Sequence, residues 1–373
     1  MELLEVGHKV LLVDSHTIGQ KASWAGGGIL SPLKPWQYGG WHNNFTQNAL
    51  IKHQWLYEKL SQAGLTYEIL NEGMLYLNEP NTSDFKNWYI ENYAQSHPHA
   101  QNATRLSHLQ ASTLLQDRGV VNPQLKFQEN NSHIWLPNVS SVRNPQLLQA
   151  LRDYVLRHHN SKVMENTRPQ LVFGLDKTCG NSKKIIGVEL TSSTSRRQFI
   201  PIQRAIITAG AWSSSFLNGL NMPRVKPIKG QMLLYRLPQA QRPRIIIMWQ
   251  DKYIIPRADG HLLVGSSVED VGFDDQTTMQ AQAVLHQFAQ SLLPQCNYET
   301  LVRSWAGLRP ATVNTNGLPI VGSVPKVIGL WVNTGHYRNG IVHAPAAASR
   351  LAQMIEQPQK NTLTQDNYES MPC

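Results

Sequence analysis

The sequence has few cysteines, and none of them forms a paired motif. Cys179, Cys296 and Cys373 are the three cysteines in 373 residues, and they lie far apart. This spacing argues against a disulfide framework and a cysteine-based zinc site, and it fits a reducing compartment. The histidines show no metal-ligand spacing either, so we expect no metal site.

Long apolar runs are also absent. No segment approaches the ~20 apolar residues of a membrane-spanning helix. The first residues, Met-Glu-Leu-Leu-Glu, are acidic where a secretory signal would be basic. We therefore expect a globular, cytoplasmic protein with no membrane partner. The net charge is +9, but lysines and arginines are scattered and no nucleic-acid motif occurs, so we expect no nucleic-acid partner either.

A third absence concerns nucleotide binding, because no G-x-G-x-x-G occurs in the chain. Residues 1–6 read as a short helix closed by Gly7, and residues 8–14 as a buried strand ending in Asp14. A carboxylate at this place in a βαβ unit binds the ribose of a dinucleotide. The first strand and glycine-rich turn would normally precede that helix. We expect them to be encoded upstream of Met1, and we expect the 373-residue chain to retain its cofactor weakly.

The rest of the pattern predicts an α/β plus α+β fold. A helix begins at Asn144, read as its cap, and residues 198–209 read as one strand that runs into Gly210. Residues 231–267 read as short antiparallel strands with a turn at 258–260. We expect a discontinuous Rossmann-like nucleotide-binding domain (1–55, 138–222 and 308–357), an inserted antiparallel-sheet substrate domain (56–137 and 223–307) and a polar tail (358–373).

Two glycine-rich segments are the strongest candidates for ligand binding. Residues 22–32 read Ala-Ser-Trp-Ala-Gly-Gly-Gly-Ile-Leu-Ser-Pro, and bare glycine backbone lets a flat ligand approach the chain closely. Glycine runs more often mark flexible turns, but the position shortly after Asp14 favours a ligand. Residues 335–340 lie between a predicted strand and a predicted helix, where a helix N-terminus can meet a ligand.

These segments resemble the D-amino-acid oxidase superfamily of FAD-dependent amine oxidases. Asp14, the 22–32 segment and Gly-His-Tyr-Arg-Asn-Gly-Ile at 335–341 are similar to signature segments of glycine oxidases linked to thiamine biosynthesis. Gly-Leu-Arg-Pro at 307–310 and the 316–322 segment extend the likeness in the same order. The resemblance implies FAD as cofactor, with a small amino acid and oxygen as substrates. Because none of the cysteines lies in a segment assigned to the flavin, we expect the FAD to be bound non-covalently. It leaves open a thiazole synthase partner and a homo-oligomer.

The resemblance also implies which residues contact FAD. Asp14 would bind the ribose, Ala22 and Ser23 would lie along the middle of the cofactor, and Val172, or Leu171 in a shifted alignment, would meet the adenine. The remaining contacts, around the isoalloxazine ring, would be Gly26, Gly27, Gly28, Ile29, Gly210, Gly335, His336, Arg338, Asn339, Gly340 and Ile341.

Three residues are implied in catalysis. Arg309 would bind the substrate carboxylate, because a guanidinium matches a carboxylate with two parallel hydrogen bonds. Taken alone, an arginine is more often a surface ion-pair partner, and Tyr253, which would help Arg309, more often packs in a strand. Arg338 would add positive charge beside the amine or the flavin. We assign His336 to cofactor shaping, since hydride transfer from the α-carbon needs no protein base.

The sequence therefore predicts FAD-dependent oxidative deamination of glycine, sarcosine and small D-amino acids to the imine and 2-oxo acid, with release of ammonia and hydrogen peroxide. The imine would supply thiazole synthesis. Two alternatives stay open. The first is a D-amino-acid dehydrogenase or tRNA-modification oxidase of the same superfamily. The second is a truncated, non-catalytic copy.

Overall fold

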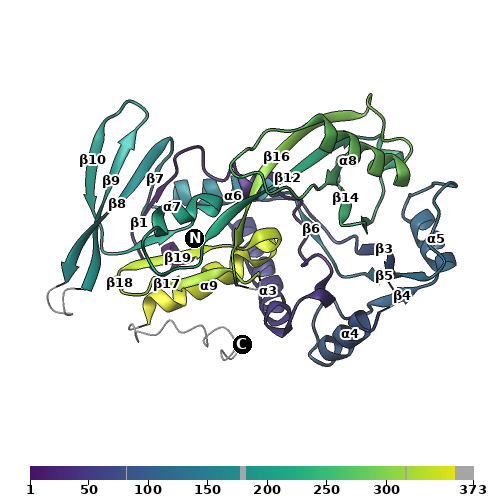
Figure 1. Cartoon of the computed structure of the whole chain (residues 1–373), viewed down its shortest axis with the longest axis horizontal. Helices are drawn as coiled ribbons and strands as arrows, with labels where there is room; N and C mark the ends of the chain where they lie inside the picture. Colours follow the sequence, from purple (N-terminus) through teal and green to yellow (C-terminus); the bar gives the residue numbers. More distant parts are fainter. Residues whose placement is uncertain (81, 177–181, 316, 358–373) are drawn as a thin grey trace.

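A broad sheet and a group of smaller sheets lie toward opposite ends of the molecule, with long helices between them (Figure 1). The computed structural model describes residues 1–80, 82–176, 182–315 and 317–357. The predicted polar tail, 358–373, lies outside these residues. Within them, no helix has the length and apolar character needed to cross a membrane.

The broad sheet has eight strands and is built from two separate parts of the sequence. In spatial order they are β16 (Leu301–Thr312), β12 (Val225–Arg236), β15 (His261–Gly265), β14 (Lys252–Pro256), β13 (Ile246–Trp249), β3 (Met74–Pro80), β5 (Asn131–Leu136) and β4 (Thr104–Leu106). Neighbours are antiparallel except β13 and β3, which pair in parallel where the two parts of the chain meet. The prediction of a mixed α/β fold with an inserted, largely antiparallel sheet is confirmed.

The two faces of this sheet bury different clusters. Ile254 of β14 packs with the buried side of α8 (Met279–Leu292), whereas Tyr253 and Ile255 pack on the opposite face with Ile29. Successive side chains of a strand point to opposite faces, so one short strand contributes to both layers. The second face meets the first glycine-rich segment and also carries α4 (Asp84–Ala94). The helix α5 (His108–Asp117) contacts β4 and β5 at the edge of the sheet.

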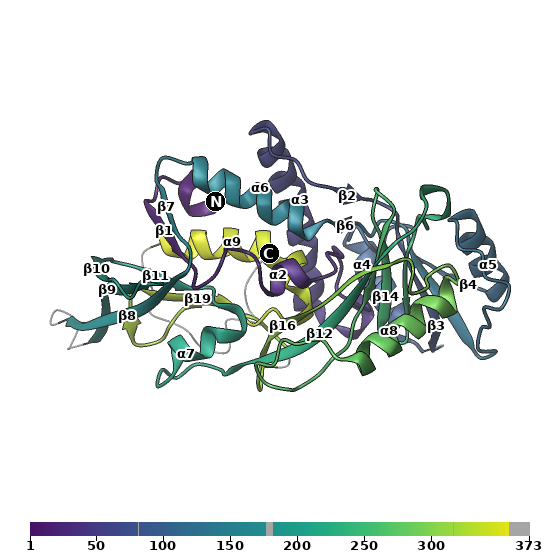
Figure 2. The same ribbon diagram turned by 90° about the horizontal axis from the view of Figure 1, so that it is seen from above.

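Smaller sheets and helices form the other end (Figure 2). The strands β1 (Val10–Val13) and β7 (Ser161–Met164) pair in parallel, and β11 (Ala205–Ile207) pairs in parallel with β19 (Leu330–Thr334), which also pairs with β17 (Ile320–Ser323). Within the described residues, β1 and β11 each have one strand partner. The helices α3 (Gly40–Gln62) and α9 (Gly340–Glu356) pack together beside these strands, close to the short α1 (Glu2–Glu5).

One predicted strand is divided in two. Residues 198–209 form β10 (Arg197–Pro201) and β11, which belong to different sheets. β10 pairs with β9 (Ser182–Ser192), and β9 pairs in turn with β8 (Thr167–Asp176), in the sheet at the far left of Figure 1. The break follows Pro201, which has no N–H to donate to a continuing ladder.

A second correction concerns Asn144. The helix α6 (Asn144–Arg157) is capped by Arg143, and Asn144 is its first residue. The Asn144 side chain instead donates to two backbone carbonyls of the first glycine-rich segment. One belongs to Ser23, in the short α2 (Ala22–Ala25), and the other to Gly26, just after it. The prediction of the helix was correct, but the role given to the asparagine was wrong. The same segment also forms an isolated bridge with β6 (Ser141–Val142), the partner of β2 (Ile69–Leu70).

Candidate active site

The first glycine loop, residues 26–29, is held by its carbonyl oxygens. The Gly26 carbonyl accepts from Asn144 Nδ2 at 2.9 Å, and the Gly27 carbonyl accepts from Arg257 Nη2 at 2.7 Å. The Gly28 carbonyl accepts from a backbone N–H of β6 at 2.8 Å. Three neighbouring elements therefore fix three successive peptide groups.

The N–H groups of this loop are not used in the same way. Within the described residues, those of residues 27–29 have no hydrogen-bond acceptor. A Cβ on Gly27 would lie 3.1 Å from a ring carbon of Tyr253, and one on Gly28, whose φ is 81°, would lie 2.2 Å from a carbonyl oxygen of β6. The loop thus offers bare backbone with free donors, as a flat ligand with acceptor atoms on its edge requires.

The second glycine loop joins β19 to α9. Gly335 has a φ of 82°, and a Cβ there would lie 2.3 Å from the methyl group of Thr312, a β16 residue. His336 Nε2 lies 2.7 Å from Asn333 Oδ1, and burial lowers the pKa of His336 to about 4. The imidazole is therefore neutral at pH 7, which suits a shaping role. Gly340 begins α9, whose first N–H groups have no intrahelical acceptors.

Arg309 lies in β16, with its guanidinium held by neutral oxygens. Its Nη1 donates to the carbonyls of Lys229 and Ser267, both at 3.2 Å, and its Nη2 donates to Ser266 Oγ at 2.7 Å. A Cβ on Gly230 would lie 2.0 Å from Nη2, so the neighbouring strand leaves room only for glycine. Within the described residues, no carboxylate forms an ion pair with this half-buried cation. Burial lowers the pKa of Arg309, and an incoming carboxylate would compensate that loss of hydration.

Tyr253 links Arg309 to the first glycine loop. Its ring contacts Gly27, as described above, and its hydroxyl favours the charged form of Arg309 and so raises the pKa of Arg309. The hydroxyl donates to Met232 Sδ at 3.5 Å, a weak acceptor that a ligand oxygen can replace. The positive charge of Arg338 also acts on Arg309, lowering its pKa. The three residues predicted to be catalytic are therefore neighbours.

Arg338 and Gly210 complete this group from two other elements. Arg338 Nε is buried and has no hydrogen-bond partner among the described residues. Gly210 begins the short helix η3 (Gly210–Trp212), which packs against β16, and its carbonyl accepts from Thr334 Oγ1 at 3.1 Å. Its φ is 54°, and a Cβ there would meet no atom within 4 Å. Arg338 thus keeps a donor without a partner in the described part of the chain, and Gly210 has open space beside its Cα.

The residues predicted to meet the other parts of FAD are on different elements. Asp14 follows β1, and its Oδ1 accepts from the His16 N–H at 2.8 Å. Val172 lies in β8 beside an irregularity in its pairing with β9. Ala22 and Ser23 begin α2, immediately before the first glycine loop. Their proposed contacts with the cofactor remain predictions.

Three supporting residues were not predicted from the sequence. Asn144 and Arg257 hold the first glycine loop, and Lys229 supplies a carbonyl to Arg309. Arg257 follows Tyr-Ile-Ile-Pro, the segment in which only Tyr253 was given a role. An arginine at the end of an apolar strand and before a turn normally reaches solvent, so nothing local in the sequence indicated its burial.

The chain is similar to several known proteins. The sequence matches the family described as FAD dependent oxidoreductase (DAO) over residues 1–354. It is 35% identical to the glycine oxidase of Pseudomonas aeruginosa over 363 residues, covering 95% of this chain and 90% of that protein. It is 32% identical over 232 residues to the bifunctional protein ThiO/ThiG of Trichormus variabilis, covering 61% of this chain and 33% of that one.

A solved structure has the same fold. The crystal structure of glycine oxidase from Geobacillus kaustophilus superimposes with a TM-score of 0.76 at 23% identity, covering 97% of this chain and 92% of that one. At this identity the superposition supports the fold alone, whereas the family match covers nearly the whole sequence. The chain belongs to the DAO family of FAD-dependent oxidoreductases.

Proposed function

We propose that this enzyme oxidises glycine, and also sarcosine and small D-amino acids, to the imine, which water hydrolyses to the 2-oxo acid and ammonia. The observation that carries the proposal is the guanidinium of Arg309. It is half-buried, lacks a carboxylate partner among the described residues and is adjacent to Tyr253, whose ring contacts the first glycine loop. An α-amino acid carries the carboxylate that such a group binds best.

The chain's own residues bind and orient the substrate. Arg309 and the Tyr253 hydroxyl would hold the carboxylate, which fixes the α-carbon relative to the glycine loop. Arg338 adds a second positive charge, which favours an amine that enters in its neutral form. His336 is neutral and bonded to Asn333, so we give it no part in proton transfer.

The residues present fit the flavin part of FAD. The free N–H groups of residues 27–29 suit the polar edge of the ring, and the start of α9 would stabilise negative charge at its pyrimidine end. Bound FAD would supply the two-electron chemistry, namely removal of a hydride from the substrate α-carbon and transfer of both electrons, with two protons, to oxygen as hydrogen peroxide. We propose no contact for the pyrophosphate, because the chain has no G-x-G-x-x-G.

We further propose the domain division 1–55, 138–222 and 308–357 for FAD, and 56–137 and 223–307 for the substrate. The broad sheet supports it, because its strands come mainly from the second set. β16 runs across the boundary at 307/308 and carries Arg309 to the junction. The similarity to ThiO/ThiG supports thiamine biosynthesis as the destination of the imine, with a thiazole synthase as partner.

The test compares two amines that differ only in the carboxylate. Glycine and methylamine are each supplied to the FAD-loaded enzyme, and flavin bleaching without oxygen is recorded together with peroxide and ammonia release in air. We expect glycine to bleach the flavin and give one peroxide per ammonia, with methylamine far slower. Equal rates for both amines would contradict the proposal. Bleaching without peroxide would indicate a dehydrogenase instead, and no bleaching with any amino acid would favour a non-catalytic protein.

A further inference from the structure

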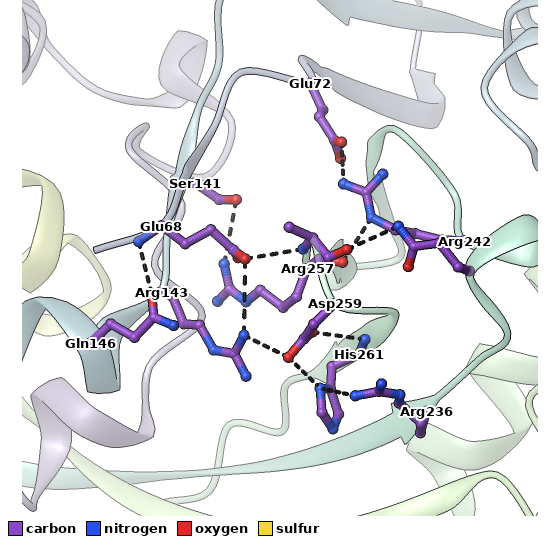
Figure 3. Close-up of polar contacts among 12 residues, drawn as sticks. Glu68, Glu72, Ser141, Arg143, Gln146, Arg236, Arg242, Arg257, Asp259 and His261 are labelled. Atoms are coloured by element: carbon purple, nitrogen blue, oxygen red, sulfur yellow. Dashed lines mark hydrogen bonds and ion pairs between the residues drawn. The ribbon is translucent and has the colours of Figure 1, made fainter. Parts of the chain in front are cut away.

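A buried arginine lies behind the first glycine loop. Arg257 follows β14 and precedes the turn at 258–260, and its side chain is 4% exposed. Its Nη2 donates to the Gly27 carbonyl at 2.7 Å. Its Nη1 lies 3.4 Å from Ser141 Oγ (Figure 3). A residue of the substrate sheet thus reaches the loop that borders the flavin site.

The backbone of Arg257 is fixed independently of its side chain. Its N–H donates to the His261 carbonyl at 2.8 Å, which closes the hairpin between β14 and β15. Its carbonyl accepts from Arg242 Nε at 2.7 Å, and Arg242 is itself paired with Glu72. The guanidinium therefore extends from a fixed backbone, and its hydrogen bond holds Gly27 in a defined position relative to the β14–β15 hairpin.

The charge of Arg257 is compensated only at a distance. The two carboxylates that favour its charge, Glu68 and Asp259, are engaged elsewhere. Asp259 lies 2.8 Å from Arg143, and Glu68 lies 3.9 Å from Arg143 and accepts from the Ala258 N–H. Among the described residues, no acidic group forms an ion pair with Arg257. Burial lowers the pKa of Arg257 to about 10, so it remains charged at pH 7. The shorter of the two hydrogen bonds that its guanidinium donates is the one to the Gly27 carbonyl.

A cation bonded to that carbonyl acts on the next peptide N–H. The Gly27 oxygen and the Gly28 N–H belong to one planar peptide group, so a charge-assisted bond at the oxygen fixes the plane. It also polarises the group and makes the N–H a stronger donor. The Gly28 N–H has no acceptor within the described residues.

We propose that Arg257 is a positioning residue: it clamps the Gly27 carbonyl and so aims and strengthens the Gly28 N–H toward the flavin. This inference rests on the assignment of the 26–29 loop to the flavin in the proposed function. It adds a link between the two halves of the site, because one hairpin carries Tyr253 for the substrate and Arg257 for the cofactor loop. The clamp acts through the loop and has no contact with substrate.

The test uses Arg257→Met and Arg257→Lys in the FAD-loaded protein, with Arg236→Met as the matched control. Arg236 is an exposed arginine of the same network that contacts only the His261 ring in Figure 3. We expect R257M to shift the visible absorption spectrum of the bound flavin and to lower kcat for glycine about tenfold, with KM within about twofold, because a donor is weakened without removal of Arg309. R257K, which keeps the charge with a single donor group, should fall between R257M and the wild type.

The absorption spectrum of the bound flavin tests the role of Arg257 independently of glycine oxidation. If the wild type does not oxidise glycine, the proposed function fails, while the spectral shift in R257M still tests the clamp. R257M with the wild-type spectrum and kcat overturns the inference. A raised KM with unchanged kcat also overturns it, because that result makes Arg257 part of substrate binding. If R257M does not fold, R257K decides, and a wild-type spectrum and kcat in R257K overturn the inference.

Discussion

Replacing Arg309 by methionine removes the charge proposed to bind the substrate carboxylate while keeping an unbranched side chain. Two charge-assisted hydrogen bonds to a carboxylate contribute about 1.5–3 kcal/mol each. Part of this is offset, because the guanidinium already donates to the Lys229 and Ser267 carbonyls and to Ser266 Oγ. A net loss of about 3–4 kcal/mol corresponds to a fall of about 10²–10³-fold in kcat/KM.

Steady-state peroxide release over a range of glycine concentrations measures this effect. We expect most of the loss in KM, because the carboxylate is bound equally in the ground state and the transition state. Arg309→Lys should recover part of it, since it restores the charge without the two parallel bonds. Arg197→Met, at an exposed arginine of β10, is the control for surface charge. An R309M enzyme whose KM for glycine stays within about twofold of the wild type would refute the reasoning.

Three further predictions concern the loop, acid stability and a buried lysine. Gly28→Ala forces a side chain into a residue whose φ is 81° and whose Cβ would lie 2.2 Å from a carbonyl oxygen, so FAD titration should show at least tenfold weaker binding, at a strain of about 1–3 kcal/mol. Burial lowers the pKa of His42 to about 4, so in urea titrations its contribution to the free energy of unfolding should be complete above pH 6.5 and decline by about 3 kcal/mol as pH falls to 4. Lys229→Met removes a 1%-exposed cation paired with two carboxylates, so the melting temperature should fall.

Each of these predictions has a matched control. Gly40→Ala adds a methyl group at the start of α3, where a Cβ meets nothing within 4 Å, and should leave FAD binding unchanged. His42→Gln should flatten the acid slope, while His159→Gln, at an exposed position, should not. Lys226→Met breaks an exposed pair with Asp270 and should lower the melting temperature less than K229M. Equal effects of variant and control in any pair would contradict the corresponding prediction.

The elements with strong local signals could be predicted from the sequence. The start signal at Asn144 located α6, and Ala-Asp-Gly located the turn between β14 and β15. The division of residues 198–209 has one local signal, Pro201, although the apolar residues on both sides of it favour a single strand. Which sheet each half joins depends on its partners, β9 and β19, and these come from distant parts of the sequence.

The candidate site could also be predicted only in part from the sequence. Arg309 and Tyr253 were proposed from segments that resemble a known family, and the structure brings them next to each other and to Gly27. Asn144, which holds the glycine loop, belongs to no such segment, and Arg257, which also holds it, ends the segment of Tyr253 without any signal of this role. Their roles depend on where a carbonyl oxygen lies after folding. Carbonyls carry no sequence signature, because every residue has one.

The arrangement of donors and acceptors in the first glycine loop explains why the site needs this outer layer of residues. Glycine allows close approach of a ligand, but it also leaves the backbone free to move, which costs conformational entropy when the loop is ordered. Asn144, Arg257 and β6 each bind one carbonyl, so the loop is ordered from the side opposite its free N–H groups. Rigidity then comes from two side chains and one strand that bind the carbonyl groups of the loop, while its N–H groups stay free for a ligand.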